Sequence, residues 1–375
     1  MMTSNSYLEV DLGCLRRNAQ SVLAQLPPGV GMIPVLKDDA YGLGLAQVGP
    51  ALAGLPGVDV IAVAHVAEGI ALRQAWVHNE ILVMGGLPTF LLPQAVEHGL
   101  TLPVWRAGWV PLLGQEAKRR GAPVRAEIKI ETGLHRIGVM PGAEMDVLLA
   151  ELAAWKDWVQ VSGAFTHFAN TGDAALTGAQ VQTFLAGVAQ LEENGIKVPR
   201  RHISGSAAFE LYPQYNLDAV RIGRRLYMDH PTQPLGGIEE VPSWRSWVTA
   251  VRTLPTGATL GYGGAYRLPD ETQVATVGVG YGDGLNQRLA EAQAPVLVRG
   301  KRARLLACCM DQCFVDVTGL DCRPDDEVTF FGRDGKGGFL SSQEVALLAG
   351  GDEGCGLTAA LSPRVARVYT DAGFA

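Results

Sequence analysis

The stretch IPVLKDDAYGLG, residues 33–44, sets a pattern that the next two hundred or so residues repeat. An apolar run ends on Lys37 and passes at once into a loop that contains Gly42 and Gly44. A lysine amine at the end of an apolar strand loses hydration, which favours its neutral, nucleophilic form and suits it to imine chemistry with an aldehyde. The ordinary alternative is a strand-end lysine that reaches for solvent.

Outward from this stretch, strand-like and helical segments alternate. Strands are predicted at 31–37, 59–65, 80–85, 101–105, 124–131, 159–168, 200–204 and 219–222. Most intervals between them show helical periodicity, as in 67–77, 145–155 and 179–193, and the last interval is short. Eight strands that alternate with helices predict an α/β fold, a (β/α)8 barrel, over residues 1–233.

The pattern changes after Pro231. Short β-rich segments with glycine turns appear at 246–254, 272–284, 294–300 and 303–319, followed by a helix at 342–348 and a last strand at 364–369. We expect a mainly β-strand domain over residues 234–375, joined by the first strand, 7–12. The glycine-rich string 278–284 resembles a nucleotide loop, but no helix is predicted after it, which argues against a Rossmann fold.

Composition narrows the classes of partner. The net charge is -7, and no run of more than three lysines or arginines occurs, so neither nucleic acid nor an anionic membrane is expected as a partner. Residues 1–30 lack the apolar core of a signal peptide. The six cysteines are sparse and have no convincing zinc spacing, so no metal is predicted. We expect a cytoplasmic protein that binds a small molecule or a second copy of itself.

Segments from near residue 7 to near residue 369 resemble the alanine racemase family, whose members use pyridoxal phosphate. Residues 37–44 are similar to the family's cofactor-lysine motif. Three positions depart from that motif, because Asp38, Asp39 and Leu43 stand where alanine, asparagine and histidine are usual. The lysine, the tyrosine and the glycine turn of the motif are all present.

The resemblance implies a cofactor site at the carboxyl ends of the barrel strands, where barrel enzymes place their chemistry. Lys37 carries the cofactor in this reading, and His167 stacks against its ring. The implied phosphate ligands are Tyr41, Ser206, Gly223 and Arg224. Ordinary alternatives are a structural histidine and a serine turn that only caps a helix.

Arg221 carries the most specific chemical implication. By the resemblance it faces the pyridine nitrogen, and His202 fixes it by a hydrogen bond. Arginine only donates and effectively never loses its proton, so the nitrogen that it meets must stay an acceptor. An unprotonated ring is a weaker electron sink, which suits racemisation and argues against a decarboxylase of the related barrel type.

Residues 128–138, IKIETGLHRIG, resemble the family's signature on the fifth barrel strand. The resemblance implies that Arg136 contacts the substrate carboxylate and that Lys129 is carbamylated to pair with it. A lysine beside an arginine suffers like-charge repulsion, which a carbamate would convert into an ion pair. The alternative is an exposed strand lysine.

In the β domain, the resemblance assigns the second catalytic base to Tyr262, a gate to Tyr281 and substrate carboxylate binding to the Met310 amide. A tyrosine buried between glycines is ordinarily a packing residue. The family is a head-to-tail homodimer, so Tyr262 and Met310 are expected to reach the partner's barrel.

The implied activity is the interconversion of L- and D-alanine by two bases, Lys37 and Tyr262. Two departures favour a serine or broad-specificity racemase instead, because Pro363 replaces a usual tyrosine and Ala307 replaces a usual arginine near the entrance. A barrel that binds pyridoxal phosphate without turnover is a further alternative, although it would not need Tyr262 or the β domain.

Overall fold

The computed structural model describes residues 4–228, 236–351 and 354–371. The contacts divide the chain into two compact units. The barrel unit comprises residues 19–40 and 45–226, and the β unit comprises residues 1–18, 41–44 and 227–375. The boundary predicted between residues 233 and 234 lies outside the described residues.

Eight parallel strands form a closed ring in the barrel unit. They are β2 (Gly31–Pro34), β3 (Val60–Val63), β4 (Glu80–Val83), β5 (Leu102–Val104), β6 (Val124–Lys129), β7 (Val159–Phe165), β8 (Arg201–His202) and β9 (Ala219–Ile222). Ladders join β2 to β9, β3 to β4, and β5 through β8 in order. Single parallel bridges close the remaining gaps, at Val35 with Ala62, Leu82 with Thr101 and Gly205 with Arg221. The predicted barrel is confirmed.

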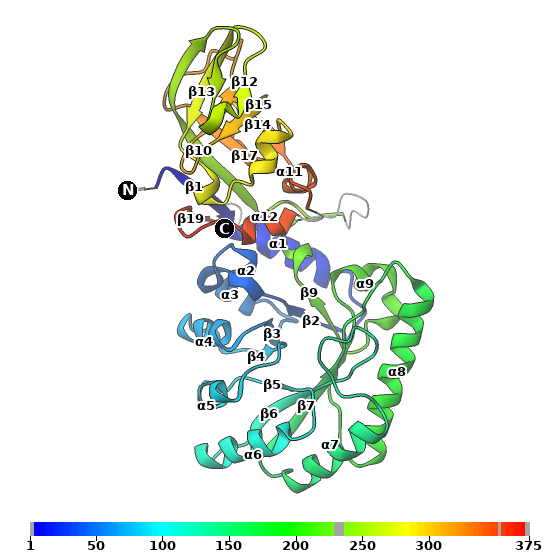
Figure 1. Cartoon of the computed structure of the whole chain (residues 1–375). Coiled ribbons are helices and arrows are strands. Elements are labelled where there is room, and N and C mark those ends of the chain that lie inside the picture. Colours follow the sequence, from blue (N-terminus) through cyan, green and yellow to red (C-terminus); the bar gives the residue numbers. More distant parts are fainter. Residues whose placement is uncertain (1–3, 229–235, 352–353, 372–375) are drawn as a thin grey trace. The chain divides into compact units, whose positions relative to one another are not determined.

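All strands except β9 end earlier than predicted, because their last residues leave the ladder where the barrel opens. The helices of the barrel unit are α3 (Leu45–Ala53), α4 (Val66–Gln74), α5 (Leu92–Glu97), α6 (Trp109–Arg120), α7 (Ala143–Ala154), α8 (Ala174–Glu193) and α9 (Ser206–Leu211). In Figure 1, α4 to α8 lie along the outer side of the strands. Helix α8 begins earlier than predicted because Oδ1 of Asp173 accepts from the N–H of Leu176 and caps it.

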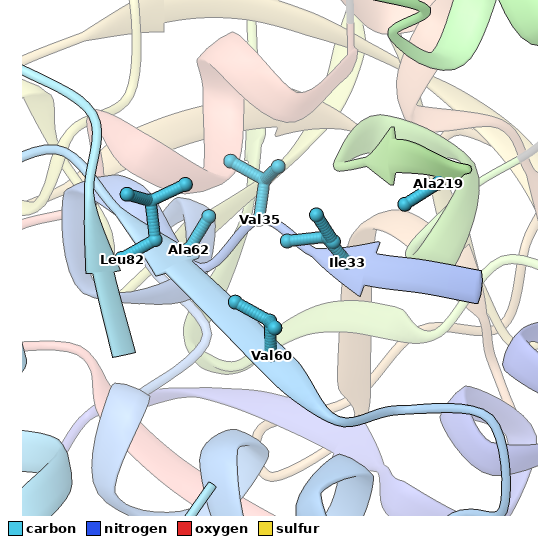
Figure 2. Close-up of a cluster of buried hydrophobic side chains, with 6 residues drawn as sticks. All are labelled: Ile33, Val35, Val60, Ala62, Leu82 and Ala219. Carbon is cyan, nitrogen blue, oxygen red and sulfur yellow. The ribbon is translucent and has the colours of Figure 1, made fainter. Parts of the chain in front are cut away.

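Aliphatic side chains fill part of the barrel interior. Figure 2 shows this cluster, which contains Ile33, Val35, Val60, Ala62, Leu82 and Ala219. Burial of each larger side chain contributes about 1.5–3 kcal/mol. Ile33 on β2 and Val35, which bridges to Ala62 just after the strand, face the same side because alternate residues of an extended segment do.

The β unit is built on a nine-stranded sheet with the order β18-β17-β14-β15-β16-β13-β10-β1-β19. Its strands are β1 (Ser6–Asp11), β10 (Pro242–Leu254), β13 (Thr272–Val277), β14 (Pro295–Val298), β15 (Lys301–Cys308), β16 (Cys313–Asp316), β17 (Glu327–Arg333), β18 (Phe339–Leu340) and β19 (Ala366–Thr370). A separate hairpin contains β11 (Thr259–Leu260) and β12 (Tyr266–Arg267). The first strand, β1, pairs with β10 and β19.

The helices α10 (Gln287–Glu291), α11 (Ser342–Leu348) and α12 (Gly354–Ala359) accompany these strands, and the boundary between the two units falls within α1 (Leu12–Leu23). The expectation that no helix follows the glycine string 278–284 is wrong, because α10 follows it. However, β13 before the string pairs antiparallel with both of its neighbours, which is not the parallel arrangement of a Rossmann unit. In the described part of the chain, no helix is long and apolar enough to cross a membrane.

Candidate active site

The carboxyl ends of the barrel strands gather positive charge. Lys37 follows β2, Lys129 ends β6 and Arg221 lies on β9. His167 follows β7. Burial and the charges of these residues and of Arg136 lower the pKa of His167 to about 3. His167 is therefore neutral at neutral pH. A concentration of cations at one end of a barrel suits anionic ligands such as a phosphate or a carboxylate.

The chain leaves Lys37 through a left-handed helical turn. Residues 38–41 have φ values from 53° to 57°, although none of them is glycine. A left-handed helix costs roughly 1–2 kcal/mol per residue, so its surroundings must stabilise it. The N–H of Asp38 donates to Oε1 of Glu68 at 2.6 Å, and Oδ1 of Asp39 accepts from the N–H of Leu45 at 2.7 Å. The aspartate at position 39 thus caps α3 and holds the turn.

Residues 41–44 of this loop belong to the β unit. There, Nε of Arg367 donates to the carbonyl of Gly42 at 2.9 Å, and the hydroxyl of Tyr369 donates to the carbonyl of Leu43 at 3.1 Å. The ring of Tyr41 lies 5.2 Å from the ring of Tyr227. Within the β unit, the last strand and Tyr227 therefore hold residues 41–44.

Arg221 is buried and held from both sides. Its Nη1 donates to Nδ1 and the carbonyl of His202 at 3.0 and 2.7 Å. Its Nη2 donates to the carbonyls of Thr166 and Ile203 at 2.7 and 3.1 Å, and to Nδ1 of His167 at 3.1 Å. Burial lowers the pKa of Arg221 to about 10, so it remains charged at neutral pH. Within the described residues Nε has no acceptor, which leaves one N–H for a ligand.

His167 is placed to meet a flat ligand. Since Nδ1 accepts from Arg221 and the ring is neutral, its hydrogen is on Nε2. A Cβ added at Gly205 would lie 3.3 Å from Cε1 of His167, so the absence of a side chain there lets the ring approach β8 closely. Part of His167 remains exposed and is open to contact.

Lys129 is 3% exposed, so the alternative of an exposed strand lysine is wrong. Its Nζ lies 4.9 Å from the centroid of the Phe165 ring. Burial, followed by the charges of Arg221 and Arg136, lowers the pKa of Lys129 well below its ordinary value. A neutral amine is the form that reacts with carbon dioxide to give a carbamate.

Ser206 and Gly223 lie together at the ends of β8 and β9. Ser206 begins α9, and its hydroxyl oxygen accepts from the N–H of Gly223 at 3.1 Å. Arg224 follows directly and begins a 3-10 turn, Arg224–Leu226. A hydroxyl beside backbone N–H groups after the seventh and eighth strands is the arrangement by which barrel enzymes often bind phosphate.

Arg136 is exposed in the loop after β6. The carboxylate of Glu131 accepts from the N–H groups of Gly133 and His135, which shapes this loop. In the parts of the chain that the structure describes, the guanidinium of Arg136 forms no hydrogen bond or ion pair. It is therefore open to a carboxylate ligand.

The predicted site residues of the β unit are at its surface. Tyr262 is 73% exposed in a 3-10 turn, Tyr262–Gly264, so its interpretation as a buried packing residue is wrong. Met310 is 54% exposed in the loop between β15 and β16. Its carbonyl accepts from the N–H of Gly282 at 2.8 Å, next to Tyr281, whose N–H donates to the carbonyl of Cys309. The loops of Met310 and Tyr281 therefore lie side by side.

The two departures from the family differ in their surroundings. Pro363 is exposed, and its neighbour Ser362 donates its N–H to the carbonyl of Asp283 in the Tyr281 loop. Ala307 is 3% exposed, in an apolar cluster with Leu260, Leu268, Val274 and Leu306. Alanine at position 307 therefore leaves only a methyl group where the family usually has a charge.

Two family models match this chain. The model of the alanine racemase N-terminal domain matches residues 10–231, and the model of the alanine racemase C-terminal domain matches residues 241–369. The chain belongs to the alanine racemase family. It is 33% identical to the alanine racemase of Desulforamulus reducens over 354 residues, 92% of this chain and 93% of that protein. It is 32% identical to the alanine racemase of Desulfovibrio desulfuricans, over 97% and 98% of the two chains.

Solved alanine racemases share the fold. The enzyme of Streptomyces coelicolor superposes with a TM-score of 0.91 and 29% identity, covering 98% of each chain. The enzyme of Bacillus anthracis, solved with bound L-Ala-P, gives 0.91 and 28%, covering 100% of this chain and 97% of that one.

Alanine racemases are isomerases that depend on pyridoxal phosphate, and the barrel end fits that cofactor. Arg221 has one N–H left for an acceptor, and His167 is a neutral ring. Lys37 supplies an amine after β2, and Ser206 and Gly223 supply a hydroxyl and a backbone N–H after β8 and β9. These residues would hold the ring, the aldehyde carbon and the phosphate of pyridoxal phosphate.

Proposed function

We propose that this chain interconverts L- and D-alanine with Lys37 and Tyr262 as the two proton-transfer groups. The observation that carries the proposal is the anchoring of Arg221, a permanent donor, between two histidines that each accept from it through Nδ1. Pyridoxal phosphate, when bound, supplies an electron-withdrawing ring that acidifies the α C–H of an amino acid. A donor that never loses its proton keeps the ring nitrogen unprotonated and the sink moderate, which favours return of the proton over other outcomes.

Inversion of a stereocentre needs one proton acceptor on each face. Nζ of Lys37 would exchange the proton at Cα of the D-enantiomer, and Oη of Tyr262 would exchange it at Cα of the L-enantiomer. Because the two groups act on opposite faces of Cα and differ in chemistry, conversion from L to D and from D to L can be tested separately.

Substrate binding is assigned to the groups that the structure leaves open. Arg136 would bind the substrate carboxylate, assisted by the N–H of Met310, while Tyr281 would narrow the entrance. The depressed pKa of Lys129 supports a carbamate there, because a negative group between Arg136 and Arg221 would relieve their repulsion. Such a site would select a small substrate that carries a carboxylate.

The proposal includes a head-to-tail homodimer with shared active sites. Tyr262 and Met310 are among the most exposed large apolar side chains of the β unit. A tyrosine that acts as a base must lose contact with bulk water, which a partner's barrel would provide. We also propose a cytoplasmic location, supported by the six cysteines, all of which are free thiols. D-alanine would there serve as a cell-wall precursor.

A serine or broad-specificity racemase is the second candidate, supported by the exposed Pro363 and the small Ala307. The test is incubation of the pyridoxal-phosphate-loaded protein with L-alanine and L-serine, followed by chiral chromatography. We expect D-alanine to accumulate to near equality with L-alanine. Release of pyruvate or loss of the carboxylate without D-alanine would overturn the proposed function.

A further inference from the structure

A buried carboxylate lies behind His202, on the side away from Arg221. Glu127 on β6 and His202 on β8 are both 0% exposed, and Oε2 of Glu127 lies 2.7 Å from Nε2 of His202. The other oxygen, Oε1, accepts from Nε and Nη2 of Arg200 at 3.1 and 2.7 Å. Arg200 in turn donates to Oε1 of Glu80 at 2.7 Å. The chain of contacts therefore runs from Arg221 through His202 and Glu127 to Arg200.

The chemistry of these partners determines the tautomer of His202. Arginine has no acceptor, so Nδ1 of His202 must accept from Nη1 of Arg221. Burial lowers the pKa of His202, which keeps the ring neutral. Burial alone would raise the pKa of Glu127, but His202 and Arg200 outweigh it and lower the pKa, which keeps the carboxylate ionised. An ionised carboxylate only accepts, so the single ring hydrogen of His202 lies on Nε2.

The plane of the His202 ring is also fixed. The ring of Phe165 stacks on it with centroids 5.3 Å apart and an interplanar angle of 6°. Phe165 holds the face of the imidazole while Glu127 holds its edge, so the Nδ1 lone pair has one direction. That direction is toward Nη1 of Arg221.

We propose that Glu127 is a positioning residue for Arg221, because its carboxylate selects the Nε2–H tautomer of His202. In the other tautomer, an N–H of His202 would face an N–H of Arg221, and the guanidinium would turn away from that contact. The Nε–H of Arg221 would then no longer point in the direction that it has in the native barrel. The catalytic consequence rests on the proposed function, whereas the tautomer itself does not.

The test is Glu127→Gln, which keeps the size of the side chain but can donate to Nε2. Protein labelled with 15N-histidine is examined by long-range 1H–15N spectra with and without pyridoxal phosphate, and His202 is assigned with His202→Asn. In the native protein we expect hydrogen on Nε2 and none on Nδ1. In Glu127→Gln we expect Nδ1–H to appear, with kcat lowered about 10-fold or more and KM for alanine nearly unchanged.

Glu80→Gln is the matched control, because Glu80 bonds the same Arg200 without contacting His202. It should leave the His202 tautomer and kcat as in the native protein. The proposal is overturned if native His202 carries its hydrogen on Nδ1, a result that needs no variant to fold. It is also overturned if Glu127→Gln keeps both the native tautomer and the native kcat. Because the tautomer is read without cofactor, its outcome is independent of whether the chain racemises alanine.

Discussion

The guanidinium of Arg221 donates through Nη1 to Nδ1 of His202 at 3.0 Å, which fixes a permanent cation on the inner side of the barrel. A further bond from Nη2 to His167 holds it from the other side. Because both histidines accept, neither of them can be protonated while these bonds last. The electrostatics at this end of the barrel therefore depend on arginine and lysine rather than on a titrating histidine.

Arg221→Glu should place an acceptor where the donor was and draw a proton onto the ring nitrogen of bound pyridoxal phosphate. A stronger electron sink would add a long-wavelength absorption band when alanine is present. Racemisation should fall, and slow transamination to pyruvate should appear. Absorption spectra and a pyruvate assay check this, with circular dichroism to confirm folding. If the folded variant has the native spectrum, Arg221 does not meet the ring.

Tyr262→Phe should slow proton removal from L-alanine more than from D-alanine, because only one face loses its acceptor. The rate of α-deuterium incorporation from heavy water is measured for each enantiomer in a single turnover. Equal losses in the two directions would remove Tyr262 from the mechanism and require another second base.

The barrel could be predicted because its signals are local. Apolar runs such as residues 32–36 and 60–64 are each followed by a polar residue, Lys37 and His65, and the intervening helices have clear periodicity. The ends of strands could not be predicted, since Ile203 and Ser204 lie in the predicted strand 200–204 but leave the ladder to contact Arg221 and Tyr215. Ladder pairing depends on neighbours that are distant in sequence.

Other features depend on tertiary contacts and carry no local signal. The left-handed turn at 38–41 contains no glycine, and the hydrogen bond from Asp38 to Glu68 that supports it joins distant residues. In the sequence Glu127 is an ordinary polar residue of a predicted strand. Its contacts with Arg200 and His202 appear only in the folded structure. Tyr262 is likewise exposed in a turn and not in the buried position that the packing alternative required.

Co-expression of Lys37→Ala with Tyr262→Phe tests whether active sites are shared between subunits. In a mixed dimer, one site would combine native Lys37 from one subunit with native Tyr262 from the other. Random pairing makes half of the dimers mixed, each with one intact site, so activity should recover to about a quarter of the native value. Each variant expressed alone is the control. If the mixture is no more active than the two variants alone, each site is built from a single chain.

Pro363→Tyr should narrow substrate preference, because a phenol in the place of proline fills space near the Tyr281 loop. The ratio of kcat/KM for alanine to that for serine is measured in both proteins. A methyl-sized difference in fit is worth about 1–3 kcal/mol, so the ratio should rise by roughly 10-fold or more in the variant. A native protein already as strict for alanine as Pro363→Tyr would show that another side chain fills this space.

The assignment of Lys37 as the cofactor lysine is the central claim, and hydride reduction tests it most directly. The protein is loaded with pyridoxal phosphate, reduced with borohydride, digested and sequenced by mass spectrometry. We predict loss of the visible absorption band and a single reduced cofactor label on Lys37, with no label in Lys37→Ala. The alternative labelling site within the chain is the buried Lys129, whose pKa burial lowers well below its ordinary value. A label on Lys129, or a covalent label that persists in Lys37→Ala, would contradict the account.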